Sequence, residues 1–430
     1  MSKRVAFHTL GCKVNYFESE GVWEKFSAAG YERVNFTDFA DVYVINTCSV
    51  TNSGDRKSRQ FIRRAVRQNP DAVVCVMGCF SQMQPEATTS IEGVDIVLGT
   101  SGRDGLVALV EEFQKSRQPI NIVSDITKER AFESLAVSKF ENRKRGILKI
   151  QDGCNNFCTF CIIPWARGRV RSEAPERVLE QARELVANGH VEIVLTGIHT
   201  GAYGEDFDDY TFADLLMELV EIDGLMRLRI SSIEVAELTN EVLAVLASDK
   251  VAKHLHIPLQ SGSDAILKAM NRKYNIVEFE DNIERIRKAL PKVSITTDII
   301  VGFPGETAEM FAQSLAAVKR IGFSELHVFP YSVRNGTLAA KMLHQIPENV
   351  KGMRVSEMLA VNEQLGEIYA AQFDGDVFDV IVEKVKDGYG FGHASNYLQI
   401  KFPVGADFAE SIVRVKMTKA GYPLCEGVII

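Results

Sequence analysis

Short apolar runs alternate with longer amphipathic stretches through the first third of the chain. The runs predict strands at residues 5–10, 41–46, 72–77 and 96–98. The stretches between them predict helices, one over residues 18–29 that ends at Gly30 and another that follows Cys48 and continues through Gln68. Short apolar strands separated by helices are typical of a parallel sheet that is covered on both faces. We therefore expect an α/β domain built on a parallel sheet.

A polar and charged segment at residues 138–145 interrupts this alternation, which then resumes. Strands are predicted at residues 147–150, 191–196, 227–231, 254–257, 293–300 and 326–329. Helices are predicted at residues 175–187, 275–290 and 307–321, and a further helix near residues 355–371 leads out of the region. Six strand–helix units indicate an incomplete (β/α)6 barrel.

The last part of the chain consists of short apolar runs broken by Gly, Pro and Asp. Five strands are predicted, at residues 377–385, 388–394, 397–402, 412–417 and 425–430. This pattern favours a small five-stranded β-barrel, similar in size to the OB-fold. We accordingly divide the chain into domains at residues 1–137, 146–370 and 371–430, with residues 138–145 as a linker.

The composition is that of an ordinary soluble protein. The chain has 430 residues, 46% of them hydrophobic and 25% charged, which is enough for two or three domains. We see no signal peptide and no stretch long enough to span a membrane, so we expect a cytoplasmic protein whose eight cysteines stay reduced. The net charge of −8 argues against broad electrostatic binding of nucleic acid, although a local basic patch remains compatible with it.

Three of the cysteines stand close together in the spacing C-x3-C-x2-C. They are Cys154, Cys158 and Cys161. Three thiolates at this spacing can hold three irons of a 4Fe-4S cluster and leave the fourth iron open to another ligand. The alternatives are three packed core cysteines or half of a zinc site, but zinc ribbons favour two C-x2-C pairs and the sequence has no second pair. We therefore predict an iron–sulfur cluster with an open coordination position.

Three other cysteines each follow or end a predicted strand of the first domain. Cys12, Cys48 and Cys79 should converge, because the carboxyl ends of parallel strands lie along one edge of the sheet. A second 4Fe-4S cluster with one open iron follows as a hypothesis. The alternative is that each is a small apolar residue packed near a strand end. Cys75 lies in the middle of a strand and Cys425 has no partner in the last domain, so both are interpreted as structural.

With these motifs in place, the whole chain resembles the radical S-adenosylmethionine (SAM) methylthiotransferases. Thr-Leu-Gly-Cys-Lys-Val-Asn at residues 9–15 is similar to the branch that modifies threonylcarbamoyladenosine. The isopentenyladenosine branch typically has Gly-Cys-Gln-Met-Asn there, and the branch acting on a ribosomal protein has Gly-Cys-Pro-Lys-Asn. Residues 195–204, 254–262 and 298–306 also match the family. Leu338, Phe80 and Val235 depart from its usual residues, and none of these departures removes a cysteine.

The resemblance implies a fold and a reaction. The fold would be an amino-terminal parallel-sheet methylthiotransferase domain, a central partial radical SAM barrel and a carboxy-terminal TRAM β-barrel. The reaction would convert N6-threonylcarbamoyladenosine at position 37, next to the tRNA anticodon, to its 2-methylthio derivative. It would use two 4Fe-4S clusters, SAM and an unidentified electron donor, without a membrane. Alternatives are isopentenyladenosine or a ribosomal-protein side chain as substrate and, more remotely, an iron–sulfur carrier or electron-transfer protein.

Candidates for cofactor binding lie after or on the strands of the predicted barrel, whose carboxyl face is where such sites form. The Gly-rich run would let backbone approach the ligand closely, and Glu234 would accept from ribose hydroxyls. For the polar members the alternative is an ordinary hydrogen bond within the barrel. The candidates are Gly197, His199, Gly201, Glu234, Gln260 and Asp298.

Candidates for tRNA contact form three basic groups. One is a helical stripe that includes Arg59, Arg63 and Arg67, opposite an apolar face, for which the alternative is a solvated helix surface. A second is Arg167 and Arg169, close to the cysteine motif, where Phe157 and Trp165 would stack on a base or shield the cluster. The third, Lys401, Arg414 and Lys416, lies on predicted strands of the last domain, which would otherwise be purely structural.

Overall fold

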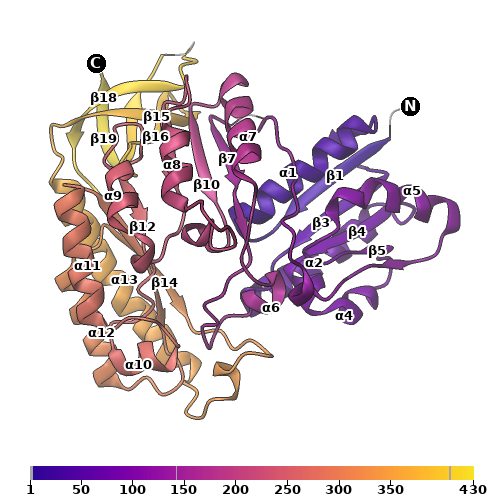
Figure 1. The fold of residues 1–430 in the computed structure, drawn as a ribbon, viewed down its shortest axis with the longest axis horizontal. Helices are drawn as coiled ribbons and strands as arrows, with labels where there is room; N and C mark the ends of the chain where they lie inside the picture. Colours follow the sequence, from indigo (N-terminus) through magenta and orange to yellow (C-terminus); the bar gives the residue numbers. More distant parts are fainter. Residues whose placement is uncertain (1–2, 142, 406–407) are drawn as a thin grey trace.

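The computed structural model describes residues 3–141, 143–405 and 408–430. Residue 142 of the predicted linker, residues 1–2 and residues 406–407 lie outside the described residues. The described chain forms three successive units, which run from indigo through orange to yellow in Figure 1. None of the helices in these ranges is long and apolar enough to cross a membrane.

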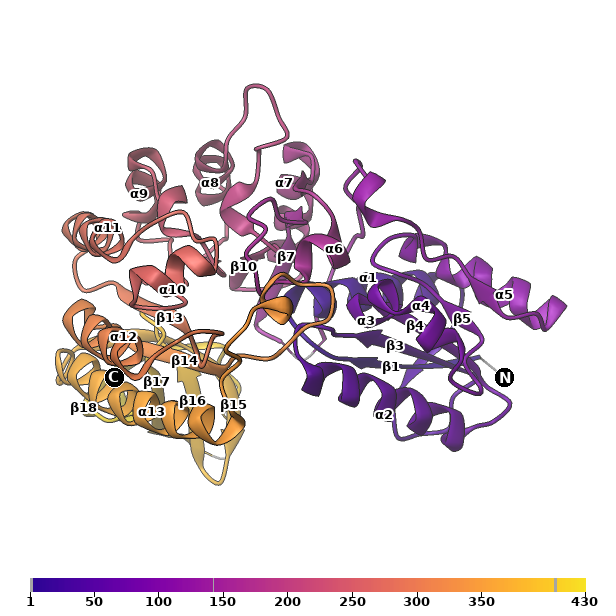
Figure 2. The same ribbon diagram turned by 90° about the horizontal axis from the view of Figure 1, so that it is seen from below.

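The first unit is built on a six-stranded, all-parallel sheet in the order β2-β1-β3-β4-β5-β6. The strands are β1 (Arg4–Thr9), β2 (Glu32–Val34), β3 (Val42–Thr47), β4 (Val73–Gly78), β5 (Ile96–Val97) and β6 (Ile120–Asn121). The helices are α1 (Lys13–Ala28), α2 (Asn52–Gln68), α3 (Cys79–Met83), α4 (Pro85–Thr89) and α5 (Leu106–Ser116). Apolar residues of α1 and α5 pack on one face and those of α2 on the other, so the predicted layering is confirmed (Figure 2).

Two short edge strands of this sheet were not predicted. β2 and β6 are three and two residues long, and none of their residues is buried. Edge strands of this length carry too few apolar positions to stand out in the sequence.

The second unit holds six parallel strands in two groups of three, β11-β10-β7 and β12-β13-β14. Parallel bridges at Leu228↔Val251 and Ser232↔His256 connect the groups. The strands are β7 (Arg145–Lys149), β10 (Glu192–Thr196), β11 (Arg227–Ile230), β12 (His254–His256), β13 (Ser294–Val301) and β14 (Glu325–Pro330). Between β7 and β10 the chain also forms a small two-stranded sheet of β8 (Gln151–Asp152) and β9 (Arg171–Ser172). The partial barrel is confirmed.

Helices cover the outside of this barrel (Figure 1). Their inward faces share one large apolar core with the strands, to which α7, α8, α9, α11 and α12 contribute. The helices are α6 (Ile163–Arg167), α7 (Pro175–Ala187), α8 (Phe212–Val220), α9 (Asn240–Leu246), α10 (Asp264–Ala269), α11 (Ile276–Ala289) and α12 (Ala308–Ile321). Of these, α6, α8, α9 and α10 were not among the named sequence predictions.

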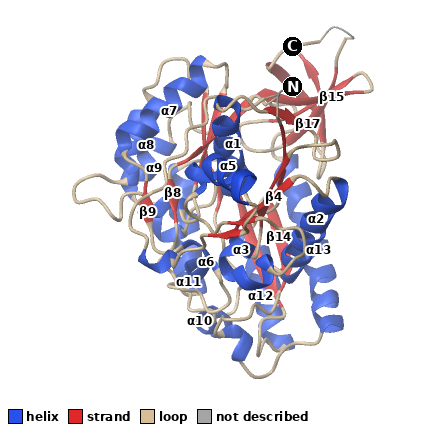
Figure 3. Ribbon diagram, turned by 90° about the vertical axis from the view of Figure 1, so that its right-hand side faces the viewer, coloured by secondary structure: helices blue, strands red, loops and turns tan. Residues whose placement is uncertain are grey.

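The third unit is a closed five-stranded barrel in the order β15-β16-β17-β19-β18, entered through the long helix α13 (Glu348–Ala371) (Figure 3). Its strands are β15 (Val377–Lys386), β16 (Tyr389–His393), β17 (Gln399–Pro403), β18 (Ile412–Lys419) and β19 (Cys425–Ile429). Ile400, Phe402, Val415 and Met417 are fully buried in its core. The predicted terminal barrel is confirmed.

Candidate functional site

The three cysteines of the first unit converge as the sheet order requires. Cys12 caps α1 directly after β1, Cys48 follows β3 and Cys79 begins α3 directly after β4. β3 pairs with β1 on one side and β4 on the other. Gly11 has a φ of +100°, and a side chain there would lie 3.0 Å from Cys48 Cβ. Glycine at this position thus lets the Cys12 loop lie against Cys48.

The second triad is held by donors that point at its sulfur atoms. The backbone N–H of Asn156 donates to Cys154 Sγ at 3.5 Å, and that of Ile163 donates to Cys161 Sγ at 3.4 Å. Arg272 Nη1 donates to Cys158 Sγ at 3.5 Å. Hydrogen bonds of this kind orient and stabilise thiolate ligands of a metal centre.

The sulfurs of each triad are spaced more widely than the ligands of a single zinc ion. Tetrahedral zinc with Zn–S bonds of about 2.3 Å brings its sulfurs within about 4 Å of each other. Among the described residues, neither cysteine triad has all three Sγ atoms within 4.8 Å of one another. Burial raises the pKa of the Cys79 and Cys161 thiols to about 12, so a thiolate at either place needs a bound cation to offset its charge. Three thiolates that need a bound cation are the donor set of an iron–sulfur cluster, and in this respect each triad fits one.

Arg167, predicted to contact tRNA, is instead fully buried, and that prediction is wrong. Its Nε donates to Cys79 Sγ at 3.4 Å and its Nη2 donates to Asn15 Oδ1 at 2.5 Å. It also pairs with Glu18 and, at 3.2 Å, with Asp152 Oδ2. A guanidinium whose donors are engaged inside the protein has none left for phosphate.

Glu18 lies at the centre of this buried network, and its role was not predicted from the sequence. Its Oε1 lies 2.6 Å from Arg103 Nη1 and 3.0 Å from Lys149 Nζ, in addition to the pair with Arg167. Arg103 and Arg167 belong to different units, so the network joins the first unit to the second. Charged residues in a helix normally lie on its solvated face, so the sequence pattern does not predict a buried glutamate here.

Several residues that were predicted to bind a cofactor make contacts with other residues of the protein. His199 pairs with Glu237 and its Nδ1 lies 3.7 Å from Cys154 Sγ. Burial lowers the pKa of His199, but its hydrogen bonds to Cys154 and Glu237 outweigh this and raise the pKa to about 11. Glu234 pairs with Arg272, the arginine that bonds Cys158. His199 and Glu234 therefore lie next to the second triad.

The glycines of the predicted ligand turn leave room for neighbouring side chains. A Cβ on Gly197 would lie 2.8 Å from Gln151 Oε1, and one on Gly201 would overlap Glu237. Packing within the protein therefore requires glycine at both positions. Gln260, with a φ of +70°, donates its N–H to the carbonyl of Asp298 and accepts from the N–H of Ile300, both at 2.9 Å.

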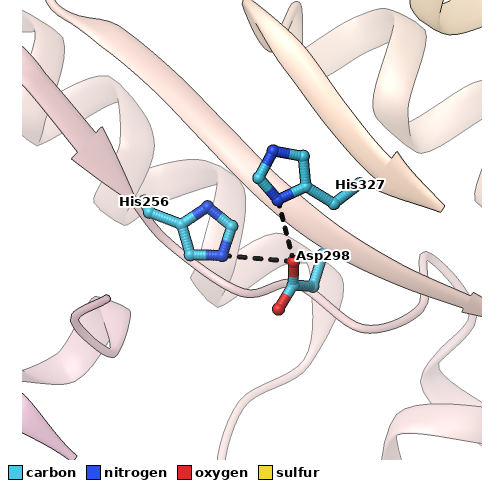
Figure 4. Close-up of side chains that lie close together, drawn as sticks. All are labelled: His256, Asp298 and His327. Atoms are coloured by element: carbon cyan, nitrogen blue, oxygen red, sulfur yellow. Dashed lines mark ion pairs between the residues drawn. The ribbon is translucent and has the colours of Figure 1, made fainter. Parts of the chain in front are cut away.

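Asp298 lies between two histidines on neighbouring strands of the barrel (Figure 4). Its Oδ1 is 3.2 Å from His256 Nε2 and 3.4 Å from His327 Nδ1. Burial raises the pKa of Asp298, but the hydrogen bonds from the two histidines outweigh burial and hold it well below its usual range. This carboxylate is therefore charged and already paired.

A cavity of about 460 Å³ brings these parts together. Its lining includes Cys12 from the first unit, Gly197 and Asp298 from the barrel, and Tyr397 from the terminal barrel. Residues separated by most of the chain thus face one space, beside a cysteine of the first triad. A cavity of this size accommodates a small planar ligand.

The remaining predicted tRNA contacts lie at or near the surface. On α2, Arg63 and Arg67 are exposed, and half-buried Arg59 lies over the ring of Phe80. Exposed Arg169 lies 4.8 Å from the centroid of Phe157, which contacts Trp165 edge-on; Trp165 is 48% exposed.

In the terminal barrel the three predicted basic residues do not form one row. Arg414 and Lys416 are exposed on β18. Lys401 lies on β17, with Nζ 4.0 Å from the Tyr389 ring centroid, and β19 separates β17 from β18. A contiguous patch is therefore limited to the two residues of β18.

Two family descriptions match segments of the chain. Residues 148–318 match the radical SAM superfamily, and residues 4–99 match the uncharacterized protein family UPF0004. The first segment contains the second cysteine triad and the second contains the first triad.

Relatives match along most or nearly all of the chain. The threonylcarbamoyladenosine tRNA methylthiotransferase MtaB of Bacillus subtilis (strain 168) is 54% identical, over 98% of this chain and 95% of the relative. MtaB of Aquifex aeolicus (strain VF5) is 42% identical, over 82% and 86%. The tRNA-2-methylthio-N(6)-dimethylallyladenosine synthase of Carboxydothermus hydrogenoformans (strain ATCC BAA-161 / DSM 6008 / Z-2901) is 35% identical, over 98% of each chain.

A solved structure shares the fold at low sequence identity. The radical S-adenosylmethionine methyltransferase TsrM from Kitasatospora setae superposes with a TM-score of 0.57 at 15% identity, covering 76% of this chain and 73% of that one. The similarity supports the arrangement of the elements and nothing finer.

Proposed function

Since this chain belongs to the radical SAM threonylcarbamoyladenosine tRNA methylthiotransferase family, we propose residue roles for the reaction of that family. The enzyme transfers a methylthio group to threonylcarbamoyladenosine in tRNA, and the radical SAM family implies a 4Fe-4S cluster and SAM. The observation that carries the assignment is the 54% identity over nearly the whole length of both chains. The 35% identity to a dimethylallyladenosine synthase is lower, which favours the first substrate.

Cys154, Cys158 and Cys161 would hold one cluster, and Cys12, Cys48 and Cys79 the other. When bound, these groups supply the reductive cleavage of SAM and the sulfur that is transferred. The chain itself fixes the ligands. Arg272 connects Cys158 to Glu234, and the backbone N–H groups after Cys154 and Cys161 hold their sulfurs in place.

The first triad is oriented by an arginine of the second unit. Arg167 holds Cys79 Sγ, and through Asn15 it also holds the start of α1, the helix that Cys12 caps. The cavity beside Cys12 would receive the flipped-out adenine, between the first triad and the barrel. A partly enclosed site limits the access of water to the reacting atoms.

The outer surfaces would bind the RNA. Arg63 and Arg67 on α2 and Arg169 beside the second triad would contact phosphate, and Trp165 would stack on a base. Arg414 and Lys416 of residues 371–430 would contact the anticodon stem-loop, while residues 1–137 and 146–370 carry the clusters. Reduced thiols and a tRNA substrate fit a cytoplasmic location, where an electron donor is available.

Mass spectrometry of tRNA nucleosides tests this function. A deletion strain should lose the 2-methylthio derivative of threonylcarbamoyladenosine, and the wild-type gene should restore it. Cys154→Ala should fail to restore it, whereas Cys425→Ala, a buried cysteine of the terminal barrel, should succeed. Persistence of the modified nucleoside in the deletion strain, or rescue by Cys154→Ala, would overturn the assignment.

A further inference from the structure

The cavity beside Cys12 has an excess of positive side chains. Lys13 and Arg229 line it, and Asp298 is the one carboxylate among the described lining residues. The carboxylate of Asp298 already pairs with His256 and His327. The other basic groups of the wall are therefore left without a carboxylate inside the cavity.

Arg229 is buried with an unsatisfied donor. Its side chain is 4% exposed; Nε and Nη2 donate to Glu192 at 2.9 and 3.2 Å, while Nη1 has no partner in the described structure. Glu192 also lies 2.7 Å from Arg145 Nε and 3.6 Å from Arg227 Nη1. Arg145 also pairs with Glu383, so two carboxylates face three guanidinium groups and net positive charge remains at this wall. An unpaired buried donor favours an acceptor from outside.

Two further residues line the same wall: His254, which is neutral because burial and the nearby Arg229 lower its pKa, and Lys13. His254 is buried, bonds Thr296 through Nε2 at 3.0 Å and leaves Nδ1 without a partner in the described structure. Both His254 and Arg229 lie against the ring of Tyr397, at 4.5 and 4.9 Å from its centroid. Lys13 opens to the cavity and makes no hydrogen bond or ion pair within the described residues.

We propose that Lys13 and Arg229 form the pocket that recognises the carboxylate of the threonylcarbamoyl group on the substrate adenosine. The inference rests on the proposed function. That carboxylate is the charged feature that separates this substituent from a neutral isopentenyl group. Lys13 directly follows Cys12, so a carboxylate bound there keeps the modified base beside the first cysteine triad. Charge-assisted hydrogen bonds to a carboxylate also give specificity, because a neutral substituent leaves the cations unpaired.

Binding of modified anticodon stem-loops tests the pocket. Three RNAs are compared on the reconstituted enzyme by fluorescence anisotropy: one with threonylcarbamoyladenosine, one with its threonine methyl ester and one with isopentenyladenosine. The wild-type enzyme should bind the acid about 10- to 100-fold more tightly than the ester, as expected for a hydrogen-bonded charge. Lys13→Gln should lose most of that ratio, and Lys13→Arg, which keeps the charge, should retain it.

Lys115→Gln is the matched control, because Lys115 is exposed on α5 and does not line the cavity. It should bind all three RNAs as the wild-type enzyme does. An acid-to-ester ratio near one in the wild-type enzyme, or the same ratio in Lys13→Gln as in the wild type, overturns the pocket.

Two further outcomes distinguish failure of the pocket from failure of the proposed function. SAM also carries a carboxylate, and a raised KM for SAM in Lys13→Gln without acid-to-ester discrimination by the wild-type enzyme would assign the pocket to SAM and overturn the proposal. Absence of any methylthio product from the wild-type enzyme would refute the proposed function. The acid-to-ester binding ratio is measured independently of turnover, so it still decides whether the carboxylate is recognised.

Discussion

Replacing Glu18 by Gln should cost more stability than any other single carboxylate change in the first unit. Glu18 is fully buried, and three cations, Arg103, Arg167 and Lys149, lie around its carboxylate. Gln keeps the shape but removes the charge, which leaves Arg167 with Asp152 as its remaining ion-pair partner. Breaking a buried ion pair in this way costs about 3–5 kcal/mol, because the surviving charges are uncompensated.

The titration of Glu18 gives a similar magnitude. Burial raises its pKa, but Arg103, Arg167 and Lys149 together outweigh burial and lower it from 4.5 to about 2. A difference of about 2.5 pH units between the folded and unfolded pKa corresponds to about 3 kcal/mol of stability. Because the folded pKa is the lower one, this stability is fully present above pH 4.5 and is lost as the pH falls towards 2.

Urea unfolding measures both effects. In a Trp165→Phe background, Trp23 on α1 is the remaining tryptophan and reports on the same helix as Glu18. Glu20→Gln is the control, because Glu20 is on the same helix and pairs with half-exposed Arg33. Glu18→Gln should lower the free energy of unfolding by about 3 kcal/mol at pH 7 and flatten its decline below pH 4.5. A loss no larger than that of Glu20→Gln would refute the reasoning.

Three further outcomes are expected. Cys12→Ala should lower reconstituted iron from about eight to about four per chain and abolish methylthio transfer while SAM cleavage persists; equal loss of both activities would argue against separate clusters. Trp165→Ala should weaken binding of the anticodon stem-loop by about 5- to 100-fold, as for loss of one stacked base, while exposed Met217→Ala does not; equal effects would remove the stacking role. Arg63→Gln and Arg67→Gln should each reduce the slope of log affinity against log salt by about 0.7–0.9, and an unchanged slope would place these arginines away from phosphate.

The sequence predicted the fold closely where apolar runs decide it. Each buried strand of the first sheet was found, and the order of a parallel sheet is enough to bring Cys12, Cys48 and Cys79 to one edge. What it could not predict is which partner a charged side chain finds. Arg167 looked like a phosphate ligand because it follows Cys161, yet its partners Asn15 and Glu18 come from another unit.

The buried network also bears on how RNA reaches the cavity. Arg167 lies on the segment that follows the second triad, whereas Asn15 and Glu18 lie on the helix that begins after Cys12. Moving the first unit away from the barrel would separate these pairs, at a cost of several kcal/mol for each unpaired buried charge. The adenine should therefore enter through the open side of the cavity, with the two units fixed. Hydrogen exchange at α1 should then be unchanged when the anticodon stem-loop binds, and faster exchange there would indicate that the units separate.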